Sequence, residues 1–137
     1  MTAPPLPFGQ TVAFAQRALT AVLTDHLAEA GTVPQTWYTL NTIATRGPAV
    51  ERDALLAEVA QAPGAAGDEL LDRLAAEGLI RTDNGSVSLT ADGEVRHGEL
   101  RTSIAGLTAK VLSPFPLDDI ERTTRTLRAV TERAESV

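Results

Sequence analysis

Residues 70–89 read LLDRLAAEGLIRTDNGSVSL, and they give the strongest indication of the fold. Asn84-Gly85 is the preferred two-residue type I′ hairpin turn. The register that this turn sets pairs Asp83 with Ser86, Thr82 with Val87 and Ile80 with Leu89. Ile80, Val87 and Leu89 then share one face, as a half-buried ribbon requires. The stretch therefore predicts a two-stranded hairpin, directly after a helix that stops at Gly78.

Helical periodicity extends from this hairpin in both directions. Upstream, apolar residues at spacings of three and four predict helices over about 8–30, 34–46, 51–61 and 65–77. Downstream, Thr90 can cap a helix over about 91–112, and a last helix runs over about 117–135. Glycines and prolines separate these helices, and residues 1–7, with three prolines, are expected to form an extended arm.

The inner faces of these helices follow from the same spacing. The second helix is expected to turn Trp37, Leu40 and Ile43 with Ala44 inward, and the fourth Gly67, Leu70, Leu71 and Leu74. The fifth helix carries a stripe of His97, Leu100, Ile104, Leu107 and Val111, and the last one of Ile120, Leu127, Val130 and Ala134.

This order of elements predicts a mostly α fold with a small two-stranded β-wing, a winged helix-turn-helix flanked by long dimerisation helices. Residues 1–137 are expected to form a single domain. The winged helix-turn-helix covers about 34–90, and the dimerisation helices cover about 8–33 and 91–137. A chain this short cannot bury the apolar stripes of its outer helices alone, so burial against a second copy predicts a homodimer.

The composition excludes several classes of protein. The 137 residues contain no cysteine, and their formal net charge is −6. The start of the sequence has no basic region or long apolar run, so we expect no signal peptide, no membrane association and a cytoplasmic location. Two histidines without close carboxylate spacing predict no metal site. We expect no cofactor and assign no catalytic residue, since no nucleophile–base pair, phosphate loop or paired-carboxylate pattern stands out.

Four segments carry a resemblance to a known family. Residues 70–80 resemble the end of the recognition helix in the multiple-antibiotic-resistance regulator (MarR) family, and residues 88–94, SLTADGE, resemble its strand-to-helix junction after the wing. Residues 37–43 resemble its second helix, and residues 117–120 the start of its last helix. The resemblance covers nearly the whole chain. It implies a homodimer that binds pseudo-palindromic DNA and is often released by small aromatic ligands.

The residues that the resemblance places at DNA are unusually acidic. In a winged helix, the early exposed face of the recognition helix meets base edges. The candidates here are Ala65, Asp68, Glu69, Asp72 and Arg73 on that helix, with Arg81 and Asn84 on the wing. Residues 51–94 hold three basic and ten acidic residues, a net charge of −7. Because phosphate neutralisation supplies nonspecific DNA affinity, we expect weak DNA binding.

The acidic helix face and His97 each have a functional and a purely structural interpretation. The acidic helix face could repel DNA, bind a cation or dock a basic partner, or be a solvated face with Glu69–Arg73 and Arg73–Glu77 pairs. His97 could be a pH switch or a ligand-pocket residue, or an interface histidine with a satisfied hydrogen bond.

A ligand cleft is expected between the long helices and the winged module. Its candidate lining is Phe14, Arg17, Trp37, Tyr38 and Arg46, where an arginine could pair with an acidic ligand. The plainer reading of each residue is packing or solvent exposure.

Two functions follow from these observations. The first is a MarR-like homodimeric transcriptional regulator that responds to a small aromatic or acidic ligand. The alternative is a MarR-fold protein that has lost DNA binding. Such a protein would use its cleft for ligand binding, partner interaction or a recruited biosynthetic enzyme activity.

Overall fold

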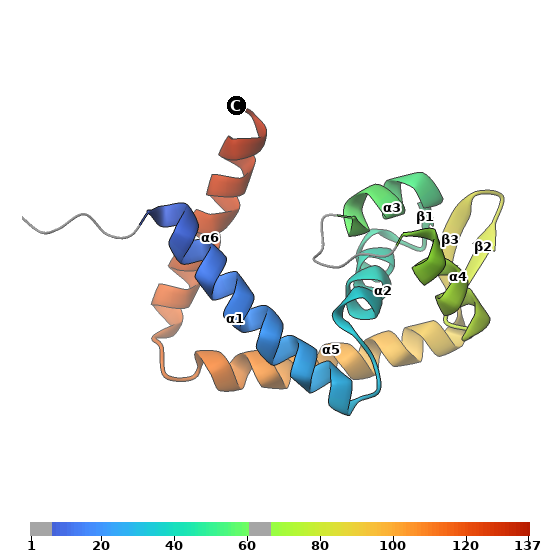
Figure 1. Ribbon diagram of the computed structural model, residues 1–137, viewed down its shortest axis with the longest axis horizontal. Helices are drawn as coiled ribbons and strands as arrows, with labels where there is room; N and C mark the ends of the chain where they lie inside the picture. Colours follow the sequence, from blue (N-terminus) through green and yellow to red (C-terminus); the bar gives the residue numbers. More distant parts are fainter. Residues whose placement is uncertain (1–6, 61–66) are drawn as a thin grey trace, which may run out of the picture. The chain divides into compact units, whose positions relative to one another are not determined.

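The computed structural model describes residues 7–60 and 67–137, and its elements follow the predicted order (Figure 1). The chain divides into two compact units, Met1–Ser103 and Ile104–Val137. The first unit contains the winged module and the helices on either side of it. Residues 1–6 of the expected arm lie outside the described residues.

The first two helices have the predicted boundaries. Helix α1 spans Phe8–Glu29 and α2 spans Pro34–Arg46, with Pro34 at its first position. Gly31, with φ +76°, separates them in the left-handed conformation that suits glycine. Helix α2 buries Leu40 and Ile43 as expected, but Ala44 is exposed, so its assignment to the inner face was wrong. The buried face is instead completed by Thr36 and Thr39.

Helices α3 and α4 are shorter than predicted. Helix α3 spans Arg52–Val59 and α4 spans Asp68–Ala76. The leucines of α4 are buried as expected, but Gly67 precedes the helix as its N-cap, with φ +64°. Gly67 was therefore wrongly counted among the inward residues of the helix, because the chain turns there. Ala65 lies outside the described residues.

The hairpin forms in the predicted register. Strands β2, Ile80–Asp83, and β3, Ser86–Leu89, pair as Ile80↔Leu89, Thr82↔Val87 and Asp83↔Ser86. Positive φ angles at Asn84 and Gly85, 51° and 80°, match the type I′ turn. A third strand, β1, Ala49–Glu51, was not predicted and pairs antiparallel with β3, giving the order β1-β3-β2. Three residues are too few to show strand periodicity, and their partner lies far along the chain.

The core of the first unit lies between the winged helices, the sheet and the ends of the long helices. Its most deeply buried large side chains are Leu27, Leu40, Ile43, Leu55, Leu71, Leu74 and Leu100, with Val87 from the sheet. This core holds the module together and leaves the outer face of α4 to solvent.

Helix α5, Ala91–Leu112, begins against the wing through the predicted cap. Thr90 Oγ1 accepts a hydrogen bond of 3.0 Å from the Gly93 amide and donates one of 2.5 Å to the Gly78 carbonyl. The Thr90 amide also donates to the Leu79 carbonyl at 3.1 Å. These hydrogen bonds therefore join the start of α5 to Gly78 and Leu79, which directly follow α4.

Gly93 is required by this close approach. A Cβ added there would lie 2.0 Å from the Leu79 carbonyl oxygen, which is backbone and cannot rotate away. We expect Gly93→Ala to lower the free energy of unfolding by about 3 kcal/mol, the upper range for overpacking. Urea unfolding followed by circular dichroism measures it. Gly98→Ala is the control, because a Cβ on Gly98 meets nothing within 4 Å. Equal stability of the two variants would contradict this account.

The second unit contains the end of α5 and helix α6, Leu117–Glu135. Asp118 and Asp119 lie in the first turn of α6, where the helix dipole favours acidic residues. No residue of α6 is buried. Ile120 is half-buried, while Leu127 and Val130 are 37% and 40% exposed. Across both units, no described helix is long and apolar enough to cross a membrane.

Candidate functional site

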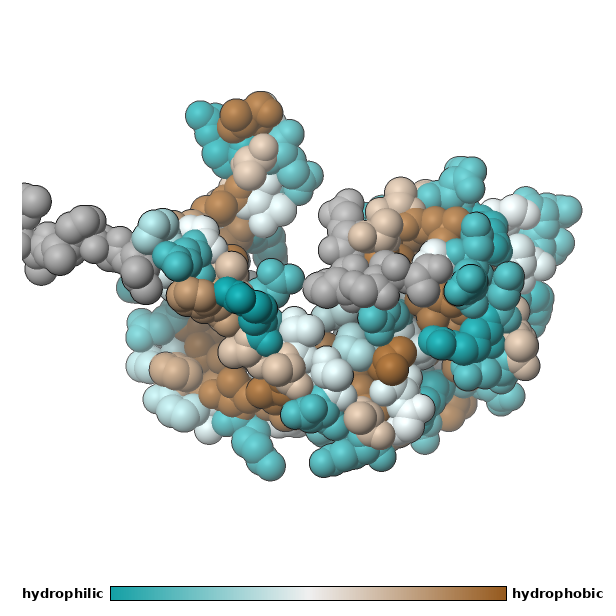
Figure 2. Space-filling view, in the orientation of Figure 1, coloured by the Kyte–Doolittle hydropathy of each residue, from teal (hydrophilic) through white to brown (hydrophobic). Residues whose placement is uncertain are grey.

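The predicted recognition helix presents carboxylates to solvent. Asp68, Glu69 and Asp72 on α4 are exposed, whereas its leucines face the core. Hydrophilic surface covers much of this part of the winged module (Figure 2). The leucines at positions 70, 71 and 74 share one buried face of the helix, so the opposite face, which carries the carboxylates, lies toward water.

The nearest arginine is neutralised by these carboxylates. Arg52, at the start of α3, donates from Nη2 to Asp68 Oδ1 at 2.8 Å and lies 3.9 Å from Asp72 Oδ1. The predicted Glu69–Arg73 and Arg73–Glu77 pairs were wrong, because Arg73 forms no ion pair with any described residue. The Arg73 side chain instead borders a hollow with Arg96 of α5. The ion-pair partner of the acidic face of α4 is therefore an arginine on the neighbouring helix α3.

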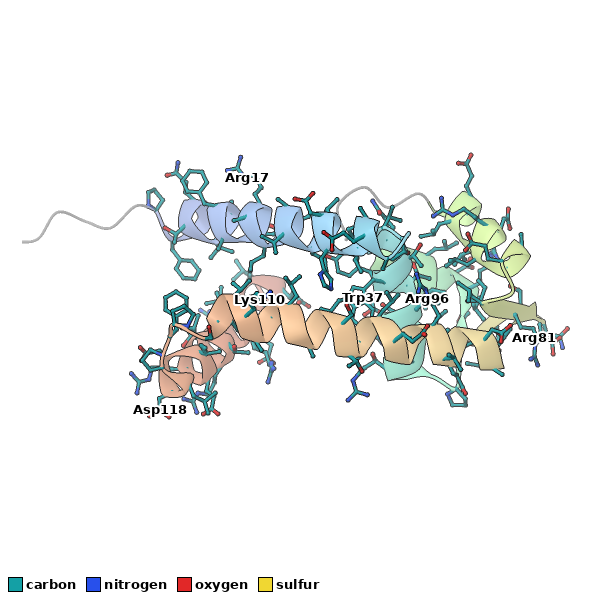
Figure 3. All side chains as sticks on the ribbon, turned by 90° about the horizontal axis from the view of Figure 1, so that it is seen from below. Arg17, Trp37, Arg81, Arg96, Lys110 and Asp118 are labelled. Atoms are coloured by element: carbon teal, nitrogen blue, oxygen red, sulfur yellow. The ribbon has the colours of Figure 1, made fainter. Side chains whose placement is uncertain are left out.

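The wing offers one exposed cation. Asp83, Asn84 and Gly85 at its tip are exposed, and the Gly85 carbonyl accepts a hydrogen bond of 2.8 Å from the Arg52 amide. Arg81 on β2 is exposed and extends outward (Figure 3). The tip itself has no basic side chain with which to enter a minor groove.

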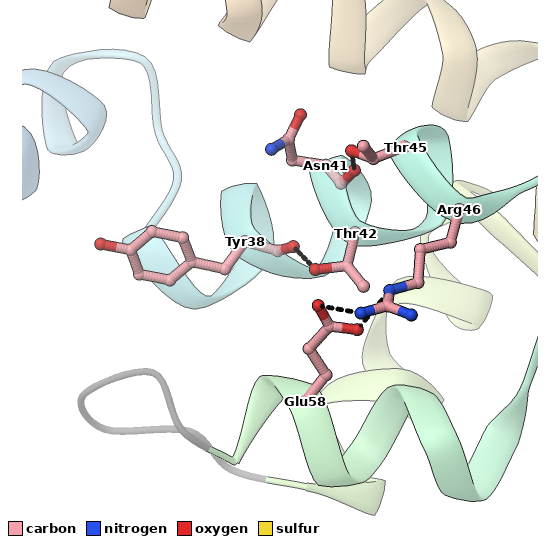
Figure 4. Close-up of polar contacts among 6 residues, drawn as sticks. All are labelled: Tyr38, Asn41, Thr42, Thr45, Arg46 and Glu58. Atoms are coloured by element: carbon pink, nitrogen blue, oxygen red, sulfur yellow. Dashed lines mark hydrogen bonds and ion pairs between the residues drawn. The ribbon is translucent and has the colours of Figure 1, made fainter. Parts of the chain in front are cut away.

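The candidate ligand residues lie in separate local environments. On α1, the guanidinium of Arg17 lies 5.0 Å from the centre of the Phe14 ring, a cation–π contact at an exposed site. On α2, Arg46 forms an ion pair with Glu58 of α3, with Nε 2.7 Å from Oε2. The ring of Tyr38 extends away from that pair (Figure 4). Arg46 is therefore already engaged by a carboxylate of the protein.

Trp37 stacks on a histidine that the sequence placed on the α5 stripe. The rings of Trp37 and His97 are 5.5 Å apart between centroids and nearly parallel, at 6°. A hydrogen bond of 3.0 Å joins His97 Nε2 and Asn41 Oδ1. Partial burial, together with the charge of Arg101, lowers the pKa of His97 from its ordinary value of 6.5. Sequence reasoning missed Asn41, because a lone amide on a helix carries no signal.

This contact predicts a pH dependence of stability. Because folding lowers the pKa of His97, the unfolded chain binds the proton more readily, and stability falls as the pH drops through 6.5 and below. We expect His97→Gln to reduce the loss of stability between about pH 7.5 and pH 5.5. Urea midpoints at both pH values measure it, with His26→Gln as the control. An unchanged pH dependence in His97→Gln would refute the assignment.

Described residues of the first unit line two hollows of similar size. One, of about 440 Å³, is lined by Gly31, Thr32, Val33, Thr36, Arg73, Glu77, Leu79 and Arg96. The other, of about 360 Å³, is lined by Ile43, Ala44, Gly47, Pro48, Ser88, Leu89, Glu94 and His97. None of the five candidate ligand residues lines either hollow. Arg96 and Glu94 gave no sequence signal, because isolated charges near a helix start are ordinary.

Comparisons with known proteins identify the fold. No family model and no curated protein sequence matches the chain. Among solved structures, the Mycobacterium tuberculosis MarR family protein Rv2887 in complex with DNA is similar with a TM-score of 0.78 and 17% identity, over 92% of this chain and 98% of that one.

Two further structures agree with this match. The salicylic acid complex of Rv2887 gives a TM-score of 0.73 and 17% identity over 92% of this chain and 99% of that one. The apo form of Escherichia coli MarR has a TM-score of 0.76 and 17% identity, over 93% of this chain and 98% of that one. The expected winged helix with flanking long helices is confirmed by these matches. The chain therefore has the winged-helix fold of MarR family proteins.

Proposed function

We propose that this chain is a homodimeric transcriptional regulator of the MarR type that responds to a small-molecule ligand. The observation that carries the proposal is the likeness to Rv2887 bound to DNA, which extends over 92% of the chain. A winged helix contacts DNA with its recognition helix and its hairpin. We propose α4 as the recognition helix and the β2–β3 hairpin as the wing, with Arg81 and Asn84 among the DNA-facing residues.

Exposed apolar residues support the homodimer. On α1, Phe8, Phe14 and Leu19 are 56%, 47% and 52% exposed, and Leu117 at the start of α6 is 67% exposed. Apolar surface also appears on α6 in Figure 2. Soluble monomers rarely leave such faces uncovered, and a second copy of the same helices would cover them symmetrically.

The charge of α4 bears on the strength of DNA binding. Asp68, Glu69 and Asp72 repel phosphates, and Arg52 is held by two of them rather than free for DNA. Recognition would then depend on base contacts and on Arg81, with a weak nonspecific component. An exposed carboxylate can accept a hydrogen bond from cytosine, which favours sequence-specific over general affinity.

The regulator proposal is tested by DNA binding at low salt. Fluorescence anisotropy with fragments from its own gene neighbourhood should show one fragment bound more tightly than random duplex. The preference should be reduced by Arg81→Gln and retained in Arg125→Gln on α6. Equal binding of all fragments would contradict regulation by sequence-specific contact.

The ligand is proposed to be a small aromatic or acidic molecule. Rv2887 has been solved with salicylic acid and with p-aminosalicylic acid. In this chain, Phe14 lies in a cation–π contact with Arg17, which makes no ion pair with a described residue, and Trp37 and Tyr38 add aromatic surface on α2.

Salicylic acid is the first probe for this ligand. At a hundredfold over its dissociation constant it should stabilise the fold by about 2.7 kcal/mol, read as a rise in melting temperature. Arg17→Gln should reduce the rise, while Arg81→Gln should not. A screen of aromatic acids that leaves the melting temperature unchanged would refute this part of the proposal.

A second candidate function is favoured by the Arg52–Asp68 ion pair. If Asp68 of α4 keeps Arg52 in an ion pair, Arg52 does not contact DNA. A module without DNA binding would serve ligand or partner binding instead. The same anisotropy experiment separates the two, since this candidate requires no detectable binding of any fragment at low salt.

A further inference from the structure

We infer that the hollow between the α1–α2 turn, α4 and α5 binds a small aliphatic carboxylate, held by Arg73 and Arg96. This α4–α5 hollow is the one of about 440 Å³ that contains both arginines. Its lining contains none of the five candidate residues for the aromatic ligand, so it would be a second site. Its volume falls within the usual range for small-molecule pockets.

The two arginines give the hollow its preference for an anion. Arg73 on α4 makes no ion pair among the residues that the structure describes, although Glu69 and Glu77 lie one helical turn away on either side. A guanidinium carries five donors in a planar fork that matches a carboxylate. Arg73 therefore offers an unused anion-binding group at the edge of the hollow.

Arg96 is held in place from outside the hollow. Its Nη2 donates to the Ala30 carbonyl at 2.8 Å, at the end of α1, and its Nη1 lies 4.0 Å from Glu99. The carbonyl bond uses one donor and fixes the side chain, which projects from α5 (Figure 3). The remaining donors are available to a ligand, and a fixed guanidinium loses less entropy on binding.

The rest of the lining sets the class of ligand. Val33, 41% exposed, and Leu79 supply apolar surface, and no lining residue is aromatic. Glu77 adds one carboxylate to a lining that holds two arginines, so the formal charge of the lining suits a single negative charge. A monocarboxylate with a compact aliphatic body fits these groups better than phosphate, which carries more charge and no apolar part.

Such a ligand would link the recognition helix to α5. Arg73 lies on α4, on the same short helix as Asp68 and Glu69, whereas Arg96 lies on α5. A carboxylate bound by both arginines would restrain α4 against α5. Any effect of this restraint on DNA rests on the proposed function, but binding itself does not.

The test is an NMR titration of the full chain without DNA. We use cyclohexanecarboxylate as the probe, with its neutral amide, cyclohexanecarboxamide, and inorganic phosphate as comparisons. We expect saturable binding of the carboxylate that Arg73→Gln weakens by about tenfold or more, the range for a hydrogen bond to a charged group. Arg81→Gln, an equal charge change outside the hollow, should leave the affinity unchanged.

Further variants distinguish this site from its alternatives. Arg96→Gln should also weaken binding, and Arg96→Lys should restore part of it while retaining a donor for the Ala30 carbonyl. Arg17→Gln should have no effect, because Arg17 is not among the residues that line the hollow. The inference is overturned if the amide or phosphate binds as tightly as the carboxylate. It is also overturned if the carboxylate does not bind, or if Arg73→Gln leaves its affinity unchanged. All these results are independent of whether the chain binds DNA.

Discussion

Leu127→Asp should convert a dimer into a monomer at micromolar concentration. Leu127 lies on the apolar stripe of α6, and the chain itself leaves 37% of it exposed. In a homodimer built from the outer helices, the new carboxylate would be buried without a partner in each subunit. Burying an unpaired charge costs several kcal/mol, which raises a dissociation constant by several orders of magnitude.

Ala129→Asp is the matched control. It adds the same charge to the same helix, two residues further and about 200° around the helix axis, on the polar face. Sedimentation velocity should show wild type and Ala129→Asp as dimers and Leu127→Asp as a monomer. Leu107→Asp on the half-buried stripe of α5 should behave like Leu127→Asp. A stable wild-type monomer at micromolar concentration would refute the dimer.

Asp68→Ser combined with Glu69→Arg should raise the affinity for random duplex DNA by roughly tenfold at low salt. The double variant removes two repulsions and adds one phosphate contact. The structure adds a further contribution, because Asp68 holds Arg52 at 2.8 Å. Without that carboxylate, Asp72, 3.9 Å away, is the one ion-pair partner left to Arg52 among the described residues. Arg52 then becomes a second cation for the DNA backbone.

The control repeats the same change in charge away from the winged module. Asp118→Ser with Asp119→Arg alters the first turn of α6 as the test variant alters the first turn of α4. If general charge were the cause, both double variants would gain affinity equally. Anisotropy as a function of salt should instead show a steeper salt dependence only for the α4 variant. Nanomolar, salt-sensitive binding of random duplex by the wild type would contradict the weak nonspecific component.

Elements with local causes could be predicted from the amino-acid sequence alone. Asn84-Gly85 supplies the two positive φ angles of a type I′ turn, so the register of the hairpin follows from two residues. Apolar spacing and Pro34 fix the boundaries of α2, and the spacing together with Thr90 fixes the start of α5. The exposure of Asp68, Glu69 and Asp72 followed from the positions of the leucines on the same helix.

Contacts between residues far apart in the sequence could not be predicted and are seen only in the folded chain. Strand β1 exists because Val50 pairs with Val87, and three residues without a partner have no reason to be extended. Arg52 reaches Asp68 from the preceding helix, whereas the local Arg73 pairs that helical spacing suggested do not form. Trp37 meets His97, and Arg73 shares a hollow with Arg96, across α2, α4 and α5. These contacts depend on how whole helices pack, and packing places side chains far apart in sequence together without leaving a local pattern.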